Sequence, residues 1–101
     1  MQHNALRRAH SVWEAAMVSI DHFRQGLLAQ MVRAAHGGLI DVLINAGELH
    51  RSLGSYPGST HGMPSCCEAM QAVMKRGDTM LLDRTSGVGM TVRYLLPRAP
   101  E

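Results

Sequence analysis

The sequence predicts a single α+β domain, in which a long helical segment precedes a mixed region that ends in a β-hairpin. Apolar residues recur at helical spacing over residues 4–36. Two segments with the alternating pattern of strands lie near the end of the chain and are joined by a glycine-containing loop. A length of 101 residues, 46% of them hydrophobic, is enough for one domain with its own core and excludes a two-domain enzyme.

The helical segment contains no proline and a single glycine. Its apolar stripe includes Leu6, Trp13, Ile20, Leu27 and Ala34, which are spaced seven residues apart. A single helix of this length is too long for a compact domain of this size. Two alternatives remain: a break near residues 19–21, or a projecting part that packs against a second copy. In the second case residues 1–21 form an N-terminal extension, with Leu6, Trp13, Met17 and Ile20 as candidate dimerisation residues.

The middle of the chain predicts two shorter helices. The apolar run at 39–44 is either a strand or the tail of a helix. Asn45 then has the position of an N-cap, with Glu48 in the place that completes a capping box, and a helix follows over 46–53. Residues 55–64 are rich in proline and glycine and predict a loop. A further helix is expected over 64–76, with Pro64 in its first turn and Cys67, Met70, Val73 and Met74 on its buried side.

The last part of the chain predicts a hairpin. Residues 79–84 and 90–96 have strand character, and residues 85–89 contain the two glycines of the connecting loop. In the second strand, Met90, Val92, Tyr94 and Leu96 alternate toward the core. Pro97 ends the strand, and residues 98–101 form a short frayed tail.

Composition limits the compartment and the partners. The two cysteines, Cys66 and Cys67, are adjacent and provide no disulfide framework, which is typical of a reducing cytoplasm. The first residues lack the apolar stretch of a signal peptide, and no apolar run has the length of a membrane span. We therefore expect a cytoplasmic protein without a membrane partner or a cofactor. A net charge of +2 permits nucleic-acid binding without arguing for it.

The order of these elements resembles that of the winged helix-turn-helix superfamily. The resemblance covers residues 22–97 and is strongest over 44–54, where a capping residue precedes Glu48-Leu49 and Leu53-Gly54 closes a short helix. The link of about ten residues between the two central helices is longer than the usual three or four. The run from Tyr56 to Cys67 also resembles uncharacterised small proteins of bacterial mobile gene cassettes.

The resemblance implies a non-catalytic regulator that binds duplex DNA as a homodimer. Helix 64–76 would lie in the major groove, and the hairpin would contact the backbone or the minor groove. The implied contact residues are Arg51, Ser65, Glu68, Gln71, Lys75, Arg76, Arg84 and Arg93. A first alternative is a winged-helix module that contacts a host protein, as an adaptor from a mobile element.

A second alternative is a thiol- or metal-dependent activity at Cys66 and Cys67. A thiol near a helix N-terminus can have a lowered pKa, and His61 or His50 would act as its base. The same residues are the candidate ligands of a zinc ion. Zinc ligands are normally two to four residues apart, however, so adjacent cysteines fit that geometry poorly.

Overall fold

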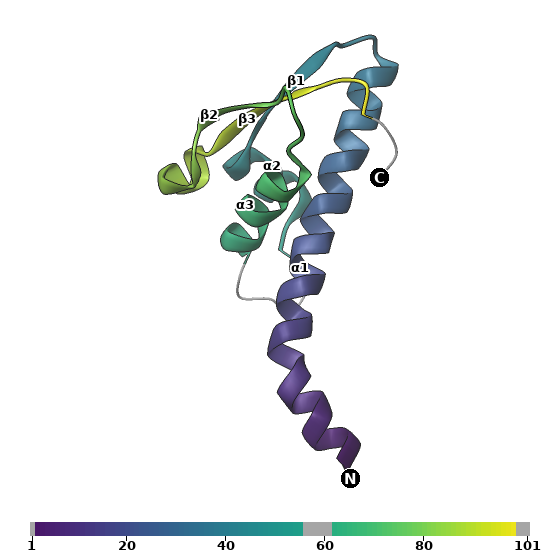
Figure 1. Ribbon diagram of the computed structural model, residues 1–101, viewed down its shortest axis with the longest axis vertical. Helices are drawn as coiled ribbons and strands as arrows, with labels where there is room; N and C mark the ends of the chain where they lie inside the picture. Colours follow the sequence, from purple (N-terminus) through teal and green to yellow (C-terminus); the bar gives the residue numbers. More distant parts are fainter. Residues whose placement is uncertain (1, 56–61, 99–101) are drawn as a thin grey trace.

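Seven elements make up the described part of the fold, which is a computed structural model (Figure 1). The backbone is described for residues 2–55 and 62–98, and the side chains for residues 16–55 and 62–98. The elements are α1 (Gln2–His36), β1 (Asp41–Asn45), α2 (Ala46–Leu53), α3 (Gly62–Val73), β2 (Thr79–Leu82), the 3-10 segment η1 (Arg84–Gly89) and β3 (Thr91–Leu95). The α+β class predicted from the sequence is confirmed.

Helix α1 is continuous and has no break near residues 19–21, so the first of the two alternatives is wrong. Phe23, Leu27 and Met31 follow one another at a spacing of four and are completely buried. Figure 1 shows α1 lying along one side of the domain and extending past it at its N-terminal end. The predicted boundary between residues 21 and 22 falls inside this helix. Ser19 is already buried and Ile20 already packs on the core, so packing against the domain begins before that boundary.

The ambiguous apolar run forms strand β1, and Asn45 then ends the strand and caps α2. Ile44 and Val42 lie opposite Val92 and Tyr94 of β3 in an antiparallel ladder. The Asn45 side-chain oxygen accepts a hydrogen bond of 3.0 Å from the backbone N–H of Glu48, as the capping pattern predicts. At the other end of α2, Gly54 takes a φ of 70°, a conformation that favours glycine.

Helix α3 begins two residues earlier and ends three residues earlier than the predicted span of 64–76. Its end is set by Asp78, whose carboxylate accepts a hydrogen bond of 2.7 Å from the Lys75 backbone N–H. The Asp78 N–H in turn donates to the Lys75 carbonyl, and Gly77 has a φ of 96°. This tight turn takes the place of the last helical turn that the sequence predicted.

The hairpin is confirmed, with β3 as the central strand of a sheet of order β1-β3-β2. The connecting loop is the 3-10 segment η1, in which the Asp83 carboxylate accepts a hydrogen bond from the Thr85 N–H. The four inward positions of the second strand, Met90, Val92, Tyr94 and Leu96, are buried as predicted. They pack with Phe23, Leu27 and Met31 of α1 and with Cys66, Met70 and Val73 of α3 in one core cluster. The helices therefore cover one face of the sheet.

A buried ion pair between Asp78 and Arg98 links the end of α3 to strand β3. The Asp78 carboxylate accepts hydrogen bonds from the Arg98 guanidinium at 2.8 Å and from the Leu95 backbone N–H at 2.9 Å. The guanidinium also donates to the Val73 carbonyl at 2.7 Å. The Asp78 and Arg98 side chains are only 0% and 10% exposed. Arg98, which the sequence assigned to a frayed tail, is thus anchored to the domain, and residues 99–101 lie outside the described part of the chain.

We expect Asp78→Asn to destabilise the fold by about 3–5 kcal/mol, because it leaves the buried Arg98 charge without its counter-ion. The matched control is Asp41→Asn, since the ion pair of Asp41 with Arg93 is half exposed on both sides. That variant should cost less than about 1 kcal/mol. Urea unfolding followed by circular dichroism measures both values. Equal costs for the two variants would contradict the role given to Asp78.

Candidate nucleic-acid interface

Four of the predicted contact residues, Ser65, Glu68, Gln71 and Lys75, were expected on the exposed face of helix 64–76. The exposed face of α3 carries two of them. Glu68 and Gln71 are exposed on the helix, while Lys75 is exposed in the turn just after it. Ala72 lies next to Gln71 on the same exposed side. Ser65 does not belong to this face and is only 5% exposed, which corrects the prediction. It lies one turn before the buried Ala69 and therefore falls on the side of α3 that packs against the core.

An ion pair connects this face to the hairpin. The Arg84 guanidinium, at the start of η1, donates to the Glu68 carboxylate at 2.5 Å, and both side chains are half exposed. In the sequence, Glu68 falls in the predicted helix over 64–76 and Arg84 in the predicted hairpin. No local pattern indicates their contact, because they are 16 residues apart. The pair neutralises the acidic charge at the middle of the α3 face.

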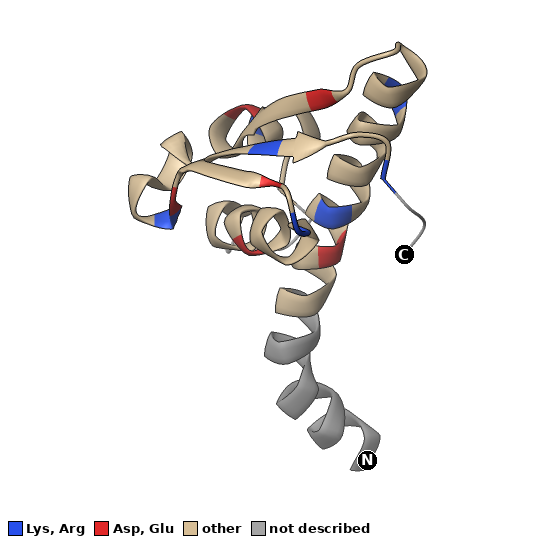
Figure 2. Cartoon of the chain, turned by 45° about the horizontal axis from the view of Figure 1, so that its top comes forward, with Lys and Arg blue, Asp and Glu red and all other residues tan. Residues whose placement is uncertain are grey.

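The remaining cations of the predicted interface do not gather on one surface. Arg93 pairs with Asp41 at 3.0 Å, and it alternates with the buried Val92 and Tyr94, so it faces away from the helices. Arg51 lies on α2 and Arg76 in the turn after α3. Within the described part of the chain, neither forms an ion pair. Figure 2 shows basic and acidic positions interspersed over the domain.

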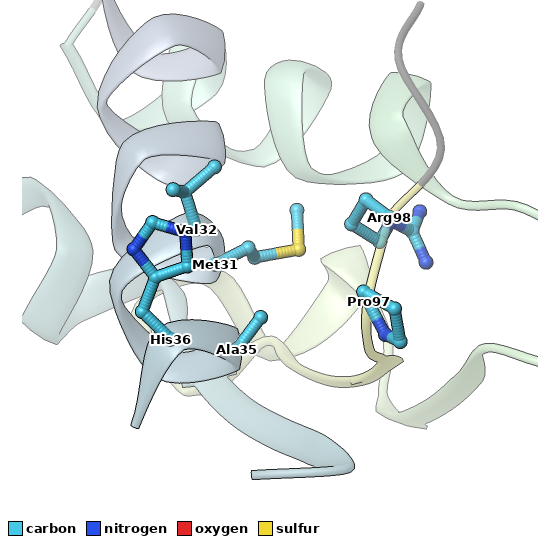
Figure 3. A pocket seen from close by; sticks show the side chains of 6 residues that line it. All are labelled: Met31, Val32, Ala35, His36, Pro97 and Arg98. Carbon is cyan, nitrogen blue, oxygen red and sulfur yellow. The ribbon is translucent and has the colours of Figure 1, made fainter. Parts of the chain in front are cut away.

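Two of the hollows that border the helices lie beside α1. One, of about 280 Å³, lies between α1 and α3 and is lined by Ala16, Ile20, Pro64, Ser65, Glu68 and Arg84. The other, of about 160 Å³, lies between the end of α1 and residues 97–98 (Figure 3). Its lining includes Met31, Val32 and Ala35, and Figure 3 shows the Met31 thioether reaching into the space between the two segments. The lining also includes His36, and the Arg98 guanidinium is engaged by Asp78 and Val73, so this hollow offers a mainly apolar surface.

The cysteines are buried beneath the α3 face. The Cys66 thiol donates to the Ala46 carbonyl at 3.5 Å, and the Cys67 thiol donates to the Gly87 carbonyl at 3.8 Å. Burial, with a smaller effect of the neighbouring Cys67, raises the pKa of the Cys66 thiol to about 12. Burial also raises the pKa of Cys67, although Arg84 opposes it. The expected lowering of the Cys66 pKa is therefore wrong, because desolvation outweighs any effect of the helix N-terminus.

Of the two histidines proposed to assist these thiols, the described one, His50, has other contacts. His50 lies stacked on Phe23, with 5.6 Å between ring centroids, and its Nε2 lies 2.9 Å from the Ser55 hydroxyl. His61 lies outside the described residues. Across residues 16–55 and 62–98, no three His, Cys, Asp or Glu side chains are placed to share a metal ion.

The four candidate dimerisation residues have different positions. The side chains of Leu6 and Trp13 lie outside the described part of the chain. Met17 is 54% exposed on α1, whereas Ile20 packs against the core of its own domain. Of the two whose side chains are described, Met17 is therefore the one placed to contact a second copy without rearrangement.

Comparison of the chain with known protein families, curated proteins and solved structures found no match. Among the described residues, no helix combines the length and the apolar character needed to cross a membrane.

We expect the Cys66 thiol to react slowly in the native protein. With a pKa of about 12, roughly one thiol in 10⁴ is ionised at pH 8, whereas an unfolded cysteine is ionised to about a quarter. In a Cys67→Ser variant, which isolates Cys66, an aromatic disulfide reagent should react at least about 100-fold more slowly in buffer than in urea. The Cys66→Ser variant serves as the control that reports Cys67 alone. Equal rates in buffer and in urea would contradict the burial of Cys66.

Proposed function

We propose that this chain is a winged helix-turn-helix module that binds duplex DNA through the exposed face of α3. The arrangement of the elements carries the proposal. The chain order α1-β1-α2-α3-β2-β3 follows the order of elements on which the resemblance of the sequence to that superfamily rests, and β2 and β3 are neighbours in the sheet β1-β3-β2. In that arrangement α3 is the recognition helix and the β2–β3 hairpin is the wing.

The α3 face carries the groups on which the proposed contact with DNA depends. Glu68 alone would repel phosphates, but Arg84 neutralises it. Gln71 then provides an exposed amide of the kind that pairs with adenine in the major groove. Arg76 and Lys75, at the end of the helix, supply positive charge for the phosphates beside that groove.

Arg76 provides the test of this proposal. Binding to duplex DNA of random sequence should weaken between about 50 and 200 mM salt, because phosphate contacts release counter-ions. Arg76→Ala should weaken binding to all sequences and reduce the salt slope by about one. Fluorescence anisotropy with a labelled duplex measures both effects.

The matched control is Arg33→Ala, which removes the same charge from an exposed position near the end of α1. It should leave the salt slope unchanged. Absence of DNA binding at about 50 mM salt by the folded wild-type protein would overturn the proposal.

A second candidate function is a winged-helix module that contacts a protein. The observation in its favour is that Arg84, Arg93 and Arg98 are all held in ion pairs, so the surface has few uncommitted cations. Exposed leucines on the outer side of the sheet, such as Leu43 and Leu95, provide apolar contact area instead. A folded protein that fails to bind DNA at low salt would favour this candidate.

A further inference from the structure

Strand β1 leaves a regular row of backbone groups without a partner in the described structure. The Leu96 N–H donates to the Ile40 carbonyl, and the Ala46 N–H donates to the Met90 carbonyl. Together with the register of the ladder, these two bonds show that the even-numbered residues of β1 bond to β3. The N–H and C=O of Leu43 therefore point to the opposite, free edge, and so does the Asp41 carbonyl.

Helices α1 and α2 leave a groove open along this edge. The groove has a volume of about 270 Å³, and its lining comes from β1, α1 and α2, including Leu43, Asn45, Gln30, Glu48 and Ser52. The Leu43 side chain, at the centre of the strand, is 60% exposed. An extended segment that lies alongside β1 thus finds free hydrogen-bonding groups and an apolar contact at the same place.

The two edges of the sheet differ in a way that singles out β1. Strand β2, at the other edge, has four residues and an irregular register between Met80 and Leu82. Such a bulge is a common means of preventing edge-to-edge pairing. Strand β1 has five residues in unbroken register and contains neither lysine nor proline. Its one charged residue, Asp41, is already paired with Arg93.

We propose that β1 pairs with β1 of a second copy of this chain, antiparallel and centred on Leu43. In this register Leu43 faces Leu43 of the second copy, and each donates its N–H to the carbonyl of the other. Val42 faces Ile44 of the second copy, which matches two apolar residues. Asp41 faces Asn45 of the second copy, so a carboxylate lies beside an amide that can donate to it.

The charges of this register favour a second copy as the occupant. Since the two strands are related by a two-fold axis, every contact occurs twice, and like charges would be placed in pairs. No like charges are paired in this register, because Asp41 of each copy lies opposite the Asn45 amide of the other. The interface differs from the stripe of α1 that the sequence analysis assigned to dimerisation, and it does not depend on DNA binding.

Introducing a charge at the centre of the β1 edge tests the proposal. The wild-type chain should sediment at about twice its own mass. Leu43→Lys should raise the dimer dissociation constant about tenfold or more, because two lysines then meet at the centre of the pairing. Leu82→Lys, at the bulged edge and similarly exposed, is the matched control and should leave the dimer intact. A monomeric wild-type chain at tens of micromolar would overturn the proposal, as would equal effects of the two variants.

A second measurement distinguishes β1 from α1. In an H-bonded antiparallel pair the opposed Cα atoms lie about 5.5 Å apart, a distance that a disulfide can span. Leu43→Cys chains should therefore cross-link to each other under mild oxidation, while Leu82→Cys chains should not. The native cysteines are buried and contribute little background. A dimer that is dissociated by Met17→Glu, but neither weakened by Leu43→Lys nor trapped by Leu43→Cys, would assign the interface to α1 instead.

Discussion

The buried carboxylate of Asp78 is the contact on which the arrangement of α3, the sheet and the end of the chain depends. One oxygen accepts the Lys75 N–H and sets the turn that follows α3, while the other accepts the N–H of Leu95 in β3. Because the same group also holds Arg98, the end of the helix, the central strand and the segment after it are fixed relative to one another. Tyr94 reinforces this link, since its hydroxyl donates to the Met70 carbonyl of α3 at 2.7 Å. A carboxylate in this position specifies geometry through several directional bonds, which an apolar side chain of similar size cannot do.

The elements whose signals are local could be predicted from the sequence. Alternation along 90–96 and the Asn45 cap depend on neighbours within a few residues, and both are confirmed. The contacts that close the structure could not be predicted, because Glu68–Arg84 and Asp78–Arg98 join residues 16 and 20 positions apart. Ser65 was misplaced because the predicted buried side of the helix was narrower than the observed one, which also includes Gly62, Cys66 and Ala69. Within the candidate interface, the sequence predicted the helix but not the ion pair by which Arg84 neutralises Glu68.

The ion pairs of Arg84 and Arg98 limit the positive charge that the surface around α3 can offer to DNA. An arginine in an exposed ion pair is only weakly held, so a phosphate can compete with Glu68 for Arg84 at low salt. Arg98 differs, because its counter-ion is buried and its guanidinium also bonds to the Val73 carbonyl. The available positive charge near α3 is therefore small, and one copy of the domain alone would bind DNA weakly. For the proposed contact with DNA, useful affinity from this surface therefore requires a second copy.

The proposed pairing of β1 strands has a direct consequence for that requirement. An antiparallel pair centred on Leu43 is related by a two-fold axis normal to the sheet, so the inner faces of both sheets lie on the same side. Because the helices cover the inner face, both copies of α3 then lie on one side of a continuous sheet. A duplex offers its major groove to one side once per helical turn, which suits two recognition helices held in this way. Together with the proposed role of α3, the proposed pairing at the edge of β1 thus accounts for an arrangement with two half-sites.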